Sequence, residues 1–285
     1  MAGTLYIIAT PIGNLEDITL RALRILRDEV VMIACEDTRH TQKLLEHYQI
    51  RKPLISYHEH NEASRTAEIL DSLEDGHSIA LVSDAGTPLV SDPGYRVVKA
   101  AINRHFAVVP VPGPSAVLAA LAASGLPTDD FRFIGFFPSK AGARRKALAD
   151  ILNTRGTVVA YESPHRILDT LAEIAVIFGS GPIVLAREIT KVHEEFLRGS
   201  AAEIREQLAK RGSVKGEITL IIGRPEKNAS AISDPLAEVL RLEIEEGVNR
   251  IQAVKTVAKQ LGLPKREVYR LAAAQGNSPI RKHRD

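Results

Sequence analysis

Residues 79–94, IALVSDAGTPLVSDPG, join an apolar run to a long, rigid connection. Residues 79–83 are apolar nearly throughout, as expected of a strand buried on both faces of a sheet. Residues 83–94 hold two glycines, two prolines, two aspartates and three hydroxyl side chains, whereas a plain strand-to-helix connection needs about 2–6 residues. Such a loop turns backbone amides and carbonyls outward and lets a ligand approach closely at Gly86. The stretch therefore predicts a ligand site at the end of a buried strand.

Similar runs recur along the chain and alternate with amphipathic segments. The strand-like runs are Leu5–Ala9, Val30–Ala34, Ile79–Ser83, Ala107–Val111, Phe131–Phe137, Thr157–Tyr161, Ile183–Ala186 and Ile218–Ile222. Segments with apolar residues near helical spacing lie between them, at 18–27, 65–73, 115–123 and 166–178. This alternation predicts an α/β protein with two largely parallel sheets, separated by a Pro-containing loop near residues 126–130.

These breaks divide the sequence into four parts. We expect an N-terminal α/β domain over 1–126, a second α/β domain over 127–224, a polar linker over 225–235 and a basic helical domain over 236–285. The last part has no strand-like run. Its three short helices are expected at 236–246, 250–261 and 265–274, with a Gly-Leu-Pro turn between the last two.

The net charge of the chain hides an asymmetry. The 285 residues hold 37 Lys and Arg and 35 Asp and Glu, a total of +2. Residues 256–285 contain seven Lys and Arg but two Asp and Glu, or +5, so residues 1–255 carry −3. The total argues against a nucleic-acid partner, but the basic tail favours one. With 45% hydrophobic and 25% charged residues, a disordered chain is excluded.

Several other classes are also excluded or disfavoured. The single cysteine, Cys35, rules out an internal disulfide and a Cys-rich zinc site. His58 and His60 lie near two glutamates, but nothing else supports a metal site, and none is expected. The absence of Trp and the few other aromatics argue against a base-stacking platform. With no basic N-terminal start and no run near the ~18 apolar residues of a membrane span, we expect a cytoplasmic protein.

Common cofactor fingerprints are missing, and polar loops follow the strands instead. The absence of G-x-G-x-x-G, G-x-x-x-x-G-K-[ST], G-x-S-x-G and H-E-x-x-H disfavours a nucleotide-dependent oxidoreductase, among others. Two carboxylates and an arginine in Glu36–Arg39 suit substrate recognition or proton removal. Ser115 is explained equally well as a helix cap. The loops at 161–166, 187–191 and 216–219 are placed to converge with these on one cleft.

Seven segments, in order, resemble the ribosomal RNA 2′-O-ribose methyltransferases of the tetrapyrrole methylase superfamily. They are ATPIGN (9–14), EDTRHT (36–41), SDAGTPLVSDPG (83–94), VPGPSA (111–116), YESPHR (161–166), REITK (187–191) and GEITLIIG (216–223). Each motif is weak alone, but seven in order are specific. The resemblance implies two α/β domains of the tetrapyrrole methylase type with S-adenosylmethionine in the interdomain cleft.

The resemblance assigns cofactor contacts to both domains: Pro11, Asp84, Gly86, Thr87, Leu89, Ser115, Ala116, Tyr161, Glu162, Arg187 and Glu188. Backbone groups and hydroxyls suit the ribose and adenine, and carboxylates favour the sulfonium cation. The sequence departs from the family at Ser91, where Asn is common.

The implied substrate is a cytidine ribose in the decoding centre of 16S rRNA, methylated by a homodimer on naked rRNA or on the small ribosomal subunit. The reaction requires alignment of oxygen, carbon and sulfur and removal of a hydroxyl proton. The candidates are Glu36 or Asp37 as base or orienting group, with Arg39 and Lys191 contacting phosphate or oxygen. An ion pair between Arg39 and Asp37 is the alternative.

RNA contacts are expected in two basic stretches. A loop and helix start at 139–146 supplies Lys140, Arg144 and Arg145, unless it is simply a solvated helix start. The C-terminal stretch resembles a helix-turn-helix and supplies Lys259, Lys265, Arg266 and Arg270, although a small dimerisation bundle would look similar.

Two other functions stay open at this point. A carbon methyltransferase acting on a tetrapyrrole precursor would share the fold and cofactor but would not explain the basic C-terminal region. A non-catalytic RNA-binding protein of ribosome assembly would not bind the cofactor.

Overall fold

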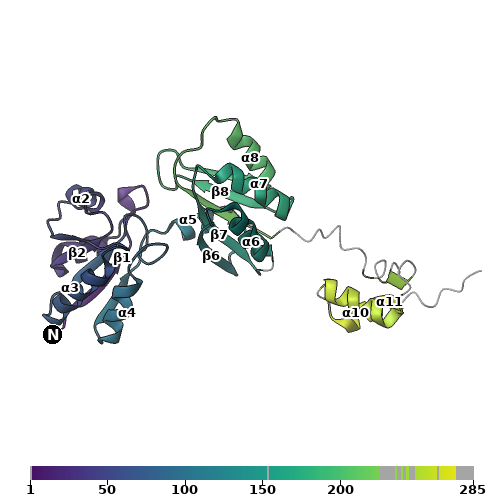
Figure 1. The fold of residues 1–285 in the computed structure, drawn as a ribbon, viewed down its shortest axis with the longest axis horizontal. Coiled ribbons are helices and arrows are strands. Elements are labelled where there is room, and N and C mark those ends of the chain that lie inside the picture. The colour runs from purple at the N-terminus through teal and green to yellow at the C-terminus, as the bar shows by residue number, and fades with distance from the viewer. Residues whose placement is uncertain are drawn as a thin grey trace, which may run out of the picture. The chain divides into compact units, whose positions relative to one another are not determined.

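The computed structural model describes residues 2–152, 154–224, 235, 239, 242–243, 248–261 and 263–273. Its contacts divide the chain into two compact units, Met1–Arg224 and Pro225–Asp285. The first unit contains two five-stranded sheets, so the predicted α/β fold with two sheets is confirmed (Figure 1). No helix among the described residues is both long enough and apolar enough to cross a membrane.

The first sheet is wholly parallel, with strand order β3-β2-β4-β1-β5. Its strands are β1 (Thr4–Ile8), β2 (Met32–Cys35), β3 (Leu54–Ser56), β4 (Ile79–Val82) and β5 (Ala107–Val111). Because β1 and β4 are neighbours whose connections leave in opposite directions, the loops that follow them flank a topological switch point. Ligands bind at such points in α/β sheets.

Helices cover both faces of this sheet. A 3-10 turn, η1 (Leu15–Asp17), precedes α1 (Leu20–Arg24), which continues as a π-helical turn, η2 (Ile25–Glu29). These and α2 (Thr38–His47) pack on one face, and α3 (Glu62–Glu74) and α4 (Tyr95–Asn103) pack on the other. Successive residues of β4 therefore enter different cores, which explains why the strand is apolar throughout.

The second sheet has strand order β6-β7-β10-β8-β9. Its strands are β6 (Phe131–Phe136), β7 (Thr157–Glu162), β8 (Ile183–Arg187), β9 (Glu195–Gly199) and β10 (Ile218–Ile222). The sheet is mixed, which corrects the expectation of a largely parallel one: β10 is antiparallel to both neighbours, and β9 is antiparallel to β8. An apolar run shows that a strand is buried but carries no information about its direction.

Helices cover both faces of the second sheet. One face packs against α6 (Ala141–Leu152), α7 (Ile167–Phe178) and α8 (Ala201–Ala209). The other packs against α5 (Ala116–Ser124), which follows the last strand of the first sheet. Arg198 on β9 fixes the end of α5, because its guanidinium donates to the carbonyl oxygens of Ala123 (2.6 Å) and Ser124 (3.3 Å). This helix therefore links the two sheets.

The second unit contains α10 (Arg250–Leu261) and α11 (Lys265–Ala273). Ala253, Val257 and Val268 are buried in its small apolar core. Most of the helix expected at 236–246, and all but the last residue of the expected linker at 225–235, lie outside the described residues.

Candidate active site

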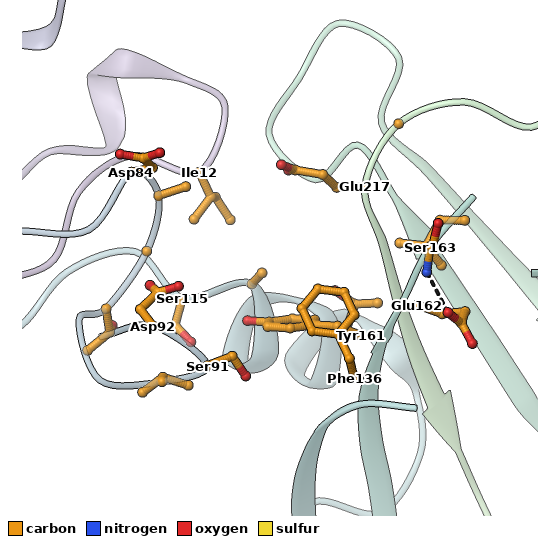
Figure 2. A pocket seen from close by; sticks show the side chains of 18 of the residues that line it. Ile12, Asp84, Ser91, Asp92, Ser115, Phe136, Tyr161, Glu162, Ser163 and Glu217 are labelled. Atoms are coloured by element: carbon orange, nitrogen blue, oxygen red, sulfur yellow. Dashed lines mark hydrogen bonds between the residues drawn. The ribbon is translucent and has the colours of Figure 1, made fainter. Parts of the chain in front are cut away.

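A cavity of about 440 Å³ lies between loops of the two sheets (Figure 2). Small-molecule sites typically have volumes of about 300–1,000 Å³. The first sheet contributes the loops after β1, β4 and β5, and the second contributes the ends of β6, β7 and the segment entering β10. The lining residues are Ile12, Asp84, Ala85, Gly86, Thr87, Val90, Ser91, Asp92, Ser115, Ala116, Phe136, Tyr161, Glu162, Ser163, Pro164, Gly216, Glu217, Ile218 and Thr219.

The loop after β4 has backbone conformations that few residues adopt. Gly86 has a φ of +80°, and its backbone exchanges two hydrogen bonds of 2.9 Å with Thr10 in the loop after β1. Leu89 and Ser91 have φ values of +71° and +68° although neither is glycine. Such conformations cost about 1–3 kcal/mol each and persist where the surrounding structure enforces them. This wall of the cavity is therefore held in a defined shape.

The loop after β5 is joined to the same wall. The Thr87 hydroxyl donates to the Pro114 carbonyl oxygen at 3.3 Å. The Ser115 hydroxyl accepts from the Leu118 N–H at 3.4 Å and caps α5. Ser115 is therefore a helix cap and also lines the cavity.

The Glu36–Asp37 pair contains two acids in different environments. The Asp37 carboxylate caps α2 and binds the Arg39 guanidinium at 2.7 Å, so the alternative ion-pair interpretation is confirmed. These hydrogen bonds, chiefly the side-chain bond from Arg39, lower the pKa of Asp37 to about 2. Burial, followed by the charges of Asp84 and Asp92, raises the pKa of Glu36. Asp37 is thus a weak proton acceptor, and neither residue lines the cavity.

Aromatic rings form part of the opposite wall. The Tyr161 ring lies 4.9 Å from that of Phe133 and 5.3 Å from that of Phe136, measured between centroids. Phe136 is 59% exposed. Burial, with smaller effects from the charges of Asp92 and Glu217, raises the pKa of Tyr161 to about 12. Its hydroxyl is therefore a donor at neutral pH, and aromatic rings gather here although the composition argued against a stacking platform.

Several charged residues of the second sheet bind one another. The Glu162 carboxylate is fully buried and pairs with Arg166 at 2.6 Å. The Lys191 ammonium binds Glu188 at 2.8 Å and Glu217 at 3.0 Å. The Arg187 guanidinium is likewise held by a carboxylate and by two backbone carbonyls. The contacts of Lys191 and Arg187 stabilise the turn after β8.

The structure brings seven of the eleven expected cofactor residues into the lining: Asp84, Gly86, Thr87, Ser115, Ala116, Tyr161 and Glu162. Pro11, Leu89, Arg187 and Glu188 are not among the lining residues. Sequence reasoning missed Ser91, Asp92 and Phe136 as individual residues. The composition of the long loop could have indicated the first two, whereas Phe136 looks like any other residue of an apolar strand.

The expected RNA contacts occupy different environments. Arg144 is only 4% exposed, and its guanidinium binds Glu173 through two hydrogen bonds of 2.7 and 3.1 Å. This corrects its assignment as an RNA contact, because a buried, paired guanidinium cannot reach a phosphate. Lys140 and Arg145 are exposed. Within the second unit, four of the expected contacts are also exposed: Lys259, Lys265, Arg266 and Arg270.

The fold consists of two helix-covered sheets with a cavity between their loops. Comparison with known proteins identifies the class of protein that has this fold. The family model for tetrapyrrole (corrin/porphyrin) methylases matches residues 4–205. The chain therefore belongs to the tetrapyrrole methylase family and is an S-adenosylmethionine-dependent methyltransferase. It is 46% identical to ribosomal RNA small subunit methyltransferase I of Halalkalibacterium halodurans over 94% of each chain. The protein of that name from Synechocystis sp. is 44% identical, over 95% of this chain and 97% of its own.

Solved structures share the fold. Cobalt precorrin-4 methyltransferase has a TM-score of 0.58 and 18% identity, over 77% of this chain and 94% of its own. Uroporphyrin-III-C-methyltransferase from Thermus thermophilus has a TM-score of 0.56 and 20% identity, over 78% of this chain and 94% of its own.

The lining residues fit S-adenosylmethionine. Gly86 lines the cavity without a side chain, in the space where a Cβ would contact Ile12 at 3.5 Å. The hydroxyls of Thr87 and Ser115 can bind polar groups, and the carboxylate of Asp84 favours a cation. Among the described residues, no group of three or more His, Cys, Asp or Glu side chains is arranged to hold a metal ion.

Proposed function

We propose that this enzyme methylates the ribose 2′-oxygen of a cytidine in the decoding centre of 16S rRNA, as naked rRNA or in the small ribosomal subunit. The observation that carries the proposal is the 46% identity, over nearly the whole chain, to a protein named as a ribosomal RNA small subunit methyltransferase. The exposed basic residues of the second unit support an RNA partner. A cytoplasmic homodimer is part of the same proposal.

The protein's own groups bind and orient the reactants. When bound, S-adenosylmethionine supplies a methyl group activated by a positively charged sulfur. The hydroxyls of Thr87 and Ser115 and the backbone at Gly86 hold it in the cavity, with negative charge nearby from Asp84. Arg39, whose side chain is 88% exposed, is positioned to contact a phosphate of the RNA.

The three other candidate residues act in the same region. We assign Glu36 and Asp37 to orienting the ribose, since the ion pair with Arg39 makes Asp37 a poor base. Lys191 contributes positive charge where Glu188 and Glu217 hold its ammonium.

Transfer of a tritiated methyl group to unmodified small subunits and to naked 16S rRNA, followed by mapping of the labelled nucleotide, tests this function. We expect label on one decoding-centre cytidine. Label on a tetrapyrrole precursor but not on rRNA would indicate the carbon methyltransferase. Absence of cofactor binding in calorimetry would indicate a non-catalytic assembly protein.

The Asp37→Ala variant is expected to lose methyl transfer and keep cofactor binding, because the Asp37–Arg39 pair lies outside the cavity lining. The substitution also removes the cap of α2. Asp37→Asn retains a capping side chain and separates the two effects. Normal transfer by Asp37→Asn, or lost cofactor affinity in either variant, would disprove the orienting role.

Neutralising four exposed cations of the second unit should weaken RNA binding. In the full chain carrying Lys259→Gln, Lys265→Gln, Arg266→Gln and Arg270→Gln, we expect RNA affinity to fall on the order of 100-fold. The slope of log affinity against log salt should fall by about 3, since each phosphate contact contributes about 0.7–0.9. Glu267→Gln, on the same helix, is the control and should not weaken binding. An unchanged slope in the fourfold variant would contradict the assignment.

A further inference from the structure

Three of the four carboxylates that line the cavity are held by the protein itself. Asp84 accepts a hydrogen bond of 3.0 Å from the backbone N–H of Asp37. The buried Glu162 carboxylate pairs with the Arg166 guanidinium at 2.6 Å, and the Glu217 carboxylate binds the Lys191 ammonium at 3.0 Å. Each of these three carboxylates therefore already binds a donor of the protein.

The fourth carboxylate, that of Asp92, has different surroundings. Within the described part of the chain it has no cationic partner and no backbone N–H donor, and the Ser83 hydroxyl is the polar group that favours its charged form. Burial, with a smaller effect from the charge of Asp84, raises its pKa. A carboxylate with raised proton affinity is better matched to accepting a proton near neutral pH.

The loop geometry fixes Asp92 at the cavity wall. Its neighbour Ser91 has a φ of +68°. Gly94, two residues after Asp92, has a φ of +135°, and a Cβ there would lie 2.8 Å from Leu81. Ser91 therefore has a conformation that non-glycine residues rarely adopt, and the loop packs against Leu81 because position 94 carries no side chain.

Tyr161 belongs to the wall contributed by the second sheet, whereas Asp92 belongs to the wall contributed by the first (Figure 2). Both side chains line the cavity, and the charge of Asp92 contributes to the raised pKa of Tyr161. A hydroxyl bound between them would meet an acceptor on one side and a phenolic donor on the other. Tyr161 itself is too weak an acid to be ionised and serve as the base.

We propose that Asp92 accepts the proton of the attacking ribose 2′-hydroxyl, an inference that rests on the proposed function. The oxygen–methyl bond forms as the sulfur–methyl bond breaks, and the sulfonium becomes a neutral thioether. The hydroxyl proton passes to an Asp92 carboxylate oxygen and then to solvent. The charged groups that influence Asp92 are Asp84 and Glu36, both acidic.

The Asp92→Asn variant tests this role. We expect kcat for methyl transfer to fall by about 10²–10⁴, as for loss of a general base, with the KM for RNA unchanged. Calorimetric dissociation constants for S-adenosylmethionine and for uncharged S-adenosylhomocysteine should both stay within about threefold of the wild-type values. Asp71→Asn, on α3 with a side chain 73% exposed, is the matched surface control. A fall in kcat of less than tenfold would overturn the proposal. A selective loss of affinity for the positively charged S-adenosylmethionine would also overturn it, because it would assign Asp92 to binding the sulfonium.

A second variant tests the same role if Asp92→Asn fails to fold. Ser83→Ala removes the hydroxyl that stabilises the Asp92 charge, so the acid limb of the pH profile of kcat/KM should move to higher pH. An unmoved limb would count against Asp92 as the base. Wild-type enzyme that methylates no rRNA would overturn both this inference and the proposed function. Active wild type with a normal Asp92→Asn variant would overturn the inference alone.

Discussion

Replacing Gly86 with valine is expected to raise the dissociation constant for S-adenosylmethionine at least about 100-fold, equivalent to about 2.8 kcal/mol of binding free energy. The φ of +80° is unfavourable for any β-branched residue. A Cβ at this position would be in ordinary van der Waals contact with Ile12 at 3.5 Å, and the two valine methyl groups would take up further space at the cavity wall. The backbone pairing with Thr10 and the shape of the cavity both depend on this residue. Calorimetric titration of the cofactor measures the loss.

Gly212→Val is the matched control for this variant. Gly212 has a similar φ of +74°, and a Cβ there meets nothing within 4 Å. We expect both variants to lose stability from backbone strain, but only Gly86→Val to lose cofactor affinity. Wild-type affinity in Gly86→Val would show that the cofactor binds elsewhere.

Replacing Glu173 with alanine should destabilise the protein by about 3–5 kcal/mol, because it leaves the guanidinium of Arg144 buried without its partner. The side chains of Arg144 and Glu173 are 5% and 15% exposed, so solvent screens the pair only weakly. The midpoint of thermal unfolding should fall by about 10 °C. Denaturant unfolding followed by circular dichroism measures the change in free energy.

The Arg144–Glu173 pair also predicts that the stability of the protein depends on pH. The Arg144 hydrogen bond is the largest cause of the lowered pKa of Glu173, so its stabilising effect is present above the ordinary glutamate pKa. The effect is lost as the pH falls through the lowered value. Glu206→Gln is the control, since the Lys210–Glu206 pair is about 70% exposed on both sides and should change stability little. If Glu173→Ala lowers the free energy of unfolding by less than about 1 kcal/mol, water or another group must stabilise the Arg144 guanidinium in the variant.

Much of the site could be predicted from residues 83–94, because a glycine- and proline-rich loop after a buried strand is unusual for a simple connector. Gly86 and Thr87 line the cavity as expected. Asp92 lies in the same loop, but its lack of a cationic partner among the described residues depends on which groups other strands bring near it. Arg144 shows the opposite case: its basic neighbours in the sequence suggested RNA, whereas its partner Glu173 is 29 residues away.

The sequence by itself determined the α/β class, most strand positions and the family, because these depend on local apolar patterns and on motifs read in order. It did not determine the direction of β10, because a strand buried on both faces is apolar whichever way it runs. It also missed β3, with three residues, and β9, whose sequence EFLRG is polar. Tertiary structure alone decided which carboxylates are paired and which face the cavity. Pairing and burial set the proton affinity of a carboxylate, and both come from residues distant in the chain.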